Sequence, residues 1–97
     1  MRNGNKWDVV PHAEIQYIES DNKLCKVVTV HREYILSTPL QELEDHLPKD
    51  TFIKIHRCYI VSCLFIRAIS KTAIFIAGRE LPVSRSAQPD IIGRYRR

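Results

Sequence analysis

Alternating apolar and polar residues predict short β-strands along most of the chain. Residues 14–19 alternate between two phases, and the sequence Asp-Asn-Lys at 21–23 has the composition of a tight turn. Residues 24–30 are rich in valine and threonine, which favour extended backbone. Residues 14–30 are therefore predicted to form a β-hairpin, and residues 33–36 a further short strand.

The second half of the chain shows the same pattern. Residues 52–69 are the densest apolar stretch of the sequence. Residues 73–77 and 79–83 are two short runs that meet near Gly78, which is typical of another hairpin. Strands and helices do not alternate along the chain, so the pattern argues against a parallel α/β sheet. A mainly β fold is expected.

One segment has the pattern of a helix rather than a strand. Thr38 and Gln41 have the spacing of a capping box, and Pro39 suits the first helical position. The leucines that follow share one face of a helix, the acids lie largely off it, and Pro48 ends the pattern. We therefore predict a short helix over about 38–47 that packs on a sheet with its acidic side in water.

Residues 89–95 are long enough for a C-terminal helix, although Gly93 lowers the helical propensity of this segment.

Size and composition limit the class of protein. With 97 residues, of which 44% are apolar, the chain suits one domain over residues 1–97. No apolar stretch reaches the roughly 18 residues of a membrane span, and no secretion signal is apparent. Three cysteines without a C-x-x-C pair favour the reducing cytoplasm over a disulfide scaffold.

Charge is distributed unevenly between the two halves. Residues 1–50 hold six Lys/Arg and nine Asp/Glu, whereas residues 51–97 hold nine Lys/Arg and two Asp/Glu. A basic half in a small domain suggests a polyanion as partner. An ordinary solvated surface has the same composition, so charge alone leaves both interpretations open.

Catalytic and metal-binding motifs are absent from the sequence. It contains no G-x-S-x-G, P-loop or G-x-G-x-x-G motif. His56 and Cys58 could form a nucleophile pair, but ordinary thiols are the commoner outcome for such cysteines. With Cys63 they give at most three zinc ligands, without the usual spacing. We expect no catalytic residues, no metal and no cofactor.

Five segments, each short, occur in an order that carries more information than any one of them. They are E-I-Q-Y-I-E-S (14–20), S-T-P-L-Q-E-L-E-D-H-L-P (37–48), F-I-K-I-H-R-C-Y-I-V (52–61), I-R-A-I (66–69) and L-P-V-S-R-S (81–86). In this order they resemble the LytTR family, the DNA-binding output domain of LytR- and AgrA-type response regulators. The family typically shows I-x-Y-I-E, S-L-x-x-L-E-x-x-L-P, F-x-x-I-H-R-S-Y-I-V-N and L-P-V-S-R.

The resemblance implies a fold and a function. The family's fold is an elongated arrangement of short antiparallel strands in three small sheets, with little helix. Its members bind double-stranded DNA through loops inserted in the major groove and recognise short repeated promoter sites. The chain is thus expected to be a sequence-specific, cytoplasmic domain of a two-component transcription regulator. A receiver domain and a second copy on an adjacent site are the further partners to consider.

Three groups of residues correspond to the family's DNA contacts. The first group is Asn22, Lys23, Cys25 and Lys26, with Lys23 at a DNA-contacting lysine. The second group is His56 and Arg57, with Arg57 at a base-contacting position. The third group is Ser84, Arg85 and Ser86, where Ser84 would contact phosphate and Arg85 or Ser86 a base.

The sequence departs from the family pattern at several of these sites. Ser62 stands where the family has Asn, and Cys25 stands where members often carry Tyr or His. The residues after Ser86 include Pro89 instead of the usual backbone-binding Lys or Asn. The changes at Ser62 and Pro89 leave an alternative open: a protein-interaction module of the same fold that has lost DNA binding.

Overall fold

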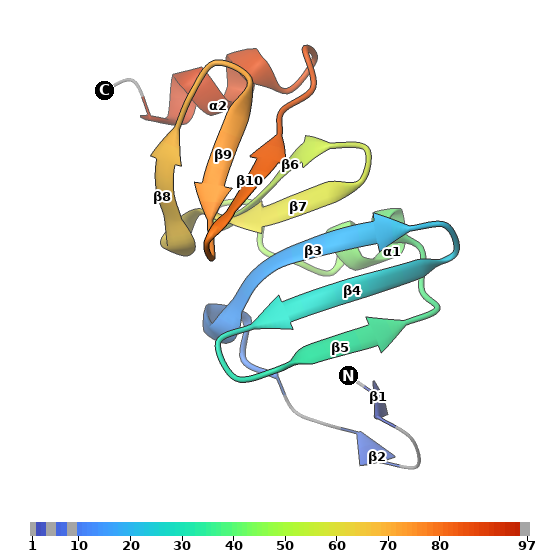
Figure 1. The fold of residues 1–97 in the computed structure, drawn as a ribbon. Coiled ribbons are helices and arrows are strands. Elements are labelled where there is room, and N and C mark those ends of the chain that lie inside the picture. Colours follow the sequence, from blue (N-terminus) through green and yellow to red (C-terminus); the bar gives the residue numbers. More distant parts are fainter. Residues whose placement is uncertain (1, 4–5, 8–9, 96–97) are drawn as a thin grey trace.

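The part of the chain that the structure describes contains ten short strands, all paired antiparallel, and two helices (Figure 1). The computed structural model describes residues 2–3, 6–7 and 10–95. The strands are β1 (Arg2–Asn3), β2 (Lys6–Trp7), β3 (Ile15–Asp21), β4 (Leu24–Thr29), β5 (Glu33–Leu36), β6 (Phe52–His56), β7 (Tyr59–Ser62), β8 (Ile66–Ile69), β9 (Ala73–Ile76) and β10 (Arg79–Pro82). The helices are α1 (Leu40–Asp45) and α2 (Gln88–Tyr95), and short 3-10 turns span His12–Glu14 and Cys63–Phe65.

The larger sheet has the strand order β5-β4-β3-β7-β6. Its centre is the predicted hairpin of β3 and β4, in which Asp21 pairs with Leu24 across a two-residue turn. The second hairpin, β6 and β7, joins it through the pairing of β3 with β7. The three consecutive strands β3, β4 and β5 and the hairpin of β6 and β7 therefore lie in one sheet. The turns between these strands lie at the two ends of that sheet.

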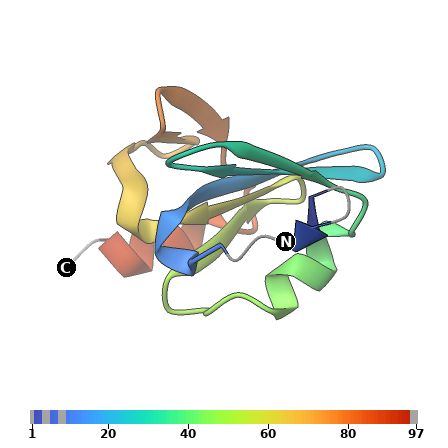
Figure 2. The same cartoon turned by 90° about the horizontal axis from the view of Figure 1, so that it is seen from below.

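Both faces of this sheet are buried over part of their area. On one face Ile18, Val27 and Ile60 pack with Leu40 of α1. On the other face the apolar side chains meet a second sheet, of order β10-β9-β8, and α2. Figure 2 shows α1 on one side of the large sheet and the β9–β10 hairpin on the other. This layering explains the dense apolar run at 52–69, because its strands must fill two cores.

The mainly β character is confirmed, and the predicted hairpins over 14–30 and 73–83 are present. The expected elongated arrangement in three small sheets is not matched. Five strands share one sheet and three share another, while β1 and β2 form a pair of only two residues each. The Cα radius of gyration is 13.2 Å, close to the roughly 13 Å of a compact chain of this length.

The helix expected over 38–47 is shorter than predicted. It spans Leu40–Asp45, its N-cap is Pro39, and no side chain caps it. The expected capping role of Thr38 is therefore wrong. The backbone at Pro39 is extended, so Pro39 is the N-cap residue and the helix begins at Leu40. The C-terminal helix expected over 89–95 is present as Gln88–Tyr95. Within the described residues, neither helix has the length and apolar character needed to cross a bilayer.

Candidate nucleic-acid interface

Three connections meet at one end of the strands: the β3–β4 turn and the β6–β7 turn, at the right in Figure 1, and the segment between β10 and α2, which rises above them towards the top. Backbone hydrogen bonds hold them together. The Ser20 N–H donates to the Cys58 carbonyl at 2.8 Å, which ties the first turn to the second. The Ser84 N–H donates to the Ile55 carbonyl at 2.8 Å, which ties the third connection to the second. We call this end the loop edge.

The β6–β7 turn projects from a local irregularity in the ladder. Lys54 pairs with Ile60 and His56 pairs with Tyr59, so the register shifts at Ile55. A bulge of this kind changes the direction of a strand and leaves one residue outside the ladder. The Ile55 carbonyl is thereby free to accept the hydrogen bond from Ser84. The bulge thus both aims the turn and attaches the neighbouring segment to it.

His56 and Arg57 have different roles within this turn. The Nδ1 atom of His56 accepts a hydrogen bond from the Cys58 backbone N–H at 3.1 Å, and its ring lies 5.8 Å from that of Tyr59. His56 therefore stabilises the turn, and its Nδ1 is not available to activate the Cys58 thiol. Arg57 is exposed, and no ion pair among the described residues holds its guanidinium.

A cleft of about 480 Å³ joins the second and third connections. Its lining consists of Lys54, His56, Arg57, Ser84, Ser86, Ala87 and Asp90. The two serine hydroxyls share a hydrogen bond of 3.2 Å, and the Ser84 carbonyl accepts from the first N–H groups of the α2 segment. Arg85 is exposed beside them. The structure thus brings together two of the three residue groups predicted from the sequence.

Lys54 is a member of this cleft that the sequence analysis did not select. Its ammonium lies 3.8 Å from a Glu44 carboxylate oxygen, and both side chains are about one-third exposed, 32% and 31%. An exposed pair of this kind contributes little free energy, so the ammonium can exchange partners. Lys54 therefore supplies a cation next to Ser84, where Ala87, Gln88 and Pro89 supply none.

The β3–β4 turn carries the first predicted group. Asn22 has a φ of 58°, a left-handed conformation that asparagine tolerates better than most residues. Asn22 and Lys23 are both exposed at the tip. Lys26 lies further back on the sheet, with its ammonium 3.6 Å from a Glu19 oxygen. The structure therefore places Asn22 and Lys23 at the loop edge and Lys26 away from the tip.

Cys25 corrects an expectation from the sequence. Its side chain is 1% exposed and packs in the core beneath α1 with Ile18 and Val27. Burial raises the pKa of its thiol. A contact between this thiol and a base is contradicted, because strand alternation turns Cys25 inward while its neighbours face solvent.

The two departures from the family pattern that favoured lost DNA binding have structural explanations. Ser62 is fully buried, and its Oγ accepts a hydrogen bond from the Leu64 N–H at 3.3 Å. Position 62 therefore faces the interior and not the loop edge. Pro89 lies in the first turn of α2, where the missing N–H needs no helical partner.

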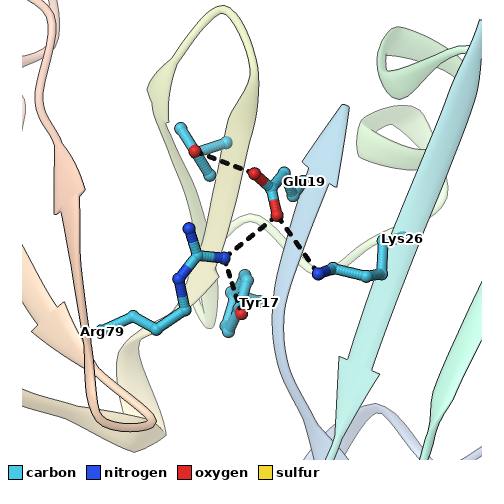
Figure 3. Close-up of polar contacts among 5 residues, drawn as sticks. Tyr17, Glu19, Lys26 and Arg79 are labelled. Carbon is cyan, nitrogen blue, oxygen red and sulfur yellow. Dashed lines mark hydrogen bonds and ion pairs between the residues drawn. The ribbon is translucent and has the colours of Figure 1, made fainter. Parts of the chain in front are cut away.

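A polar cluster ties the two sheets together behind the loop edge (Figure 3). Arg79, on β10, donates from Nη1 to Glu19 at 3.0 Å and to the Tyr17 hydroxyl at 3.1 Å. The Tyr59 hydroxyl donates to the other Glu19 oxygen at 3.0 Å, and Lys26 approaches the same carboxylate. Glu19 is thus the acceptor that joins β10, β4 and β7. We call these five residues the Glu19 cluster.

The Glu19 cluster predicts a pH-dependent contribution to stability. Burial acts to raise the pKa of the Glu19 carboxyl, but the hydrogen bonds from Arg79 and Tyr59 and the charges of Arg79 and Lys26 outweigh it and lower the pKa. A lowered carboxyl pKa stabilises the fold above the unfolded-state pKa, and this stabilisation is lost as the pH falls through the folded-state pKa.

Glu19→Gln should therefore lower the free energy of unfolding at pH 7 by about 1–2 kcal/mol. The difference from the parent should shrink as the pH falls below about 4.3, the ordinary pKa of a glutamate. Urea unfolding at several pH values measures it, with the exposed Glu33→Gln as control. A constant difference across the acid range would contradict the assignment.

Within the described residues, no group of three or more His, Cys, Asp or Glu side chains gathers as a metal site would require. The three cysteines are free thiols. The loop edge is rich in hydrogen-bond donors and cations, namely Lys23, Lys54, Arg57, Arg85 and two serine hydroxyls, and Asp90 is the carboxylate that lines its cleft. Such a set suits a ligand that carries acceptors and negative charge.

Comparison with known proteins agrees with this chemistry. The LytTr DNA-binding domain family matches residues 5–93. The chain belongs to the LytTR family. A solved LytTR structure, the LytTr DNA-binding domain of a methyl-accepting/DNA response regulator from Bacillus cereus, is 31% identical with a TM-score of 0.82. That match covers 95% of this chain and 90% of the other.

Two longer proteins carry a similar LytTR sequence. The CO-responsive transcriptional regulator RcoM of Rhodospirillum rubrum is 34% identical over 68 residues, which is 70% of this chain and 29% of that protein. The sensory transduction protein LytT of Bacillus subtilis is 29% identical over 89 residues, 86% of this chain and 37% of that protein. The chain thus spans about a third of the length of these relatives. LytTR domains are the DNA-binding domains of transcription regulators, including those of two-component systems.

Proposed function

We propose that this chain is a sequence-specific binding unit for double-stranded DNA that inserts the loop edge into the major groove. The observation that carries the proposal is the cleft in which Arg57 and Lys54 meet Ser84 and Ser86. These residues come from separate parts of the sequence, and their donors converge on one space. Duplex DNA offers hydrogen-bond acceptors on both its guanine edges and its phosphates.

The side chains of the loop edge divide into two roles. Arg57 is exposed at the tip of a two-residue turn and can donate two hydrogen bonds to the O6 and N7 atoms of a guanine. Lys23 and Lys54 present single ammonium groups that neutralise phosphates. Ser84 and Ser86 are donors suited to phosphate oxygens, and Arg85 can serve base or phosphate.

The proposed setting follows the relatives. We place the chain in the cytoplasm as one domain of a response regulator, where it acts by binding and not by catalysis. A receiver domain in the same protein would set its activity, and a second copy would occupy the adjacent repeat of a promoter site. Free thiols suit that compartment.

Selection from a random duplex pool tests the proposal. The chain should enrich a short motif, and log Kd against log salt should have a slope of magnitude about 3 to 4, since about that many phosphates meet cations at the loop edge. Fluorescence anisotropy between low and physiological salt measures the slope. Failure to enrich any motif, with no salt dependence of residual binding, would favour a protein-interaction module of the same fold.

Lys54→Gln should weaken binding to selected and unrelated duplexes alike. Loss of one phosphate contact should reduce the magnitude of the salt slope by about 0.9 and leave sequence preference unchanged. Lys49→Gln is the matched control. Lys49 is exposed and precedes the start of β6, whereas Arg57 and the loop edge follow the end of this strand. A slope unchanged by Lys54→Gln, or equally reduced by Lys49→Gln, would remove Lys54 from the interface.

A further inference from the structure

A second hollow opens at the loop edge, beside the β3–β4 turn. It has a volume of about 380 Å³. Its lining consists of Ser20, Asn22, Lys23, Cys25, Ser37, Thr38 and Pro39. The pairing of Cys25 with Leu36 fixes its two walls, because it holds the end of β5 against the start of β4. The segment 37–39, between β5 and α1, therefore belongs spatially to the first predicted DNA-contact group.

The hydroxyls of this segment have no structural task in the described part of the protein. The sequence pattern assigns Thr38 to helix capping, but α1 begins at Leu40 behind Pro39, without a side-chain cap. Ser37 is exposed and Thr38 is partly exposed, and no other described residue hydrogen-bonds either hydroxyl. Among the residues that the structure describes, nothing therefore engages either hydroxyl as a donor.

The charge of the hollow suits an anion. Of the described residues that line it, only Lys23 is charged, and none is a carboxylate. This distinguishes it from the neighbouring depression on the other face of the hairpin, which Glu19 and Asp21 line. Phosphate oxygens accept hydrogen bonds and donate none, so hydroxyl donors beside an ammonium complement them.

We propose that Ser37 and Thr38 bind a backbone phosphate of the duplex next to the one that Lys23 neutralises. The inference rests on the proposed function and extends it, since it makes the first contact group a two-walled site built from the β3–β4 turn and the β5–α1 connection. The Ser20 to Cys58 hydrogen bond keeps this site in register with the Arg57 turn. The two sites then contact one duplex together.

Removal of the hydroxyls tests the inference. Ser37→Ala combined with Thr38→Val should raise Kd about threefold to tenfold on both a selected and a random-sequence duplex. The salt slope should stay that of the parent, because a neutral donor releases no counterion, whereas Lys23→Gln should reduce its magnitude by about 0.9. Ser37→Thr and Thr38→Ser keep the hydroxyls and should retain parent affinity.

Thr51→Val is the matched control. Thr51 is partly exposed, as Thr38 is, but it precedes the start of β6, whereas Arg57 follows the end of this strand. If the double variant binds like the parent, or if Thr51→Val loses as much affinity, the inference is wrong. Ser37→Asp, which should fold on an exposed connection, should weaken binding more than Ser37→Ala, and equal affinities would also overturn it. A parent chain that binds no duplex would instead overturn the proposed function.

Discussion

Arg57→Ala is expected to weaken binding to a selected duplex by about 1–3 kcal/mol and to relax the preference at one base pair. Arg57 is the exposed residue at the tip of the β6–β7 turn, and no ion pair among described residues holds it. Its removal should leave the melting temperature nearly unchanged, as for other surface substitutions.

Anisotropy titrations on the selected duplex and on single-base variants of it measure the effect. Arg57→Lys separates charge from geometry, since lysine keeps the attraction to phosphate but lacks the planar fork that matches a guanine edge. We expect Arg57→Lys to recover affinity on random duplexes more than discrimination on the selected one. Unfolding of Arg57→Ala would show that Arg57 is needed for the fold, and unchanged discrimination by the folded variant would show that Arg57 does not contact bases.

Ile55→Ala should lower the free energy of unfolding by about 2–5 kcal/mol. The side chain is fully buried in the cluster formed by both sheets and α2, where it packs with residues such as Ile74, Leu81 and Ile91. A cavity at this point loosens the contact that carries the 84–86 segment. DNA affinity should therefore fall at temperatures where the variant is still folded.

Urea unfolding of the parent and variant measures the change in stability. Ile35→Ala is the control, because Ile35 is 58% exposed on the edge strand β5 and should cost little. Equal losses for the two variants would show that burial at the bulge does not hold the sheets together.

The strands could be predicted because their pattern is local. The hairpin over 14–30 follows from period-two alternation and a two-residue turn, and its register depends on few distant contacts. The number of sheets could not be predicted, because the β3–β7 pairing joins residues about forty positions apart. Pairing of that range depends on the whole core and not on local propensity.

The candidate site was predictable only in part. Arg57 and Ser84 were found from motifs, and their shared cleft agrees with that selection. Cys25 was misplaced, because one step along a strand reverses the face of the sheet. Lys54 and Thr38 were missed, because each owes its position to a neighbour from another part of the chain. The signal that could have found Lys54 was its polar character within an apolar run.

Backbone amide chemical-shift mapping with a duplex selected from a random pool is the most direct test of the proposal that the loop edge binds DNA. Saturable shifts should concentrate in residues 22–23, 37–38, 54–57 and 84–86. The β9–β10 turn, Ala77–Gly78, lies at the other end of its hairpin and should change little (Figure 1). Shifts concentrated at that turn, or no saturable shift at the loop edge, would contradict the proposal.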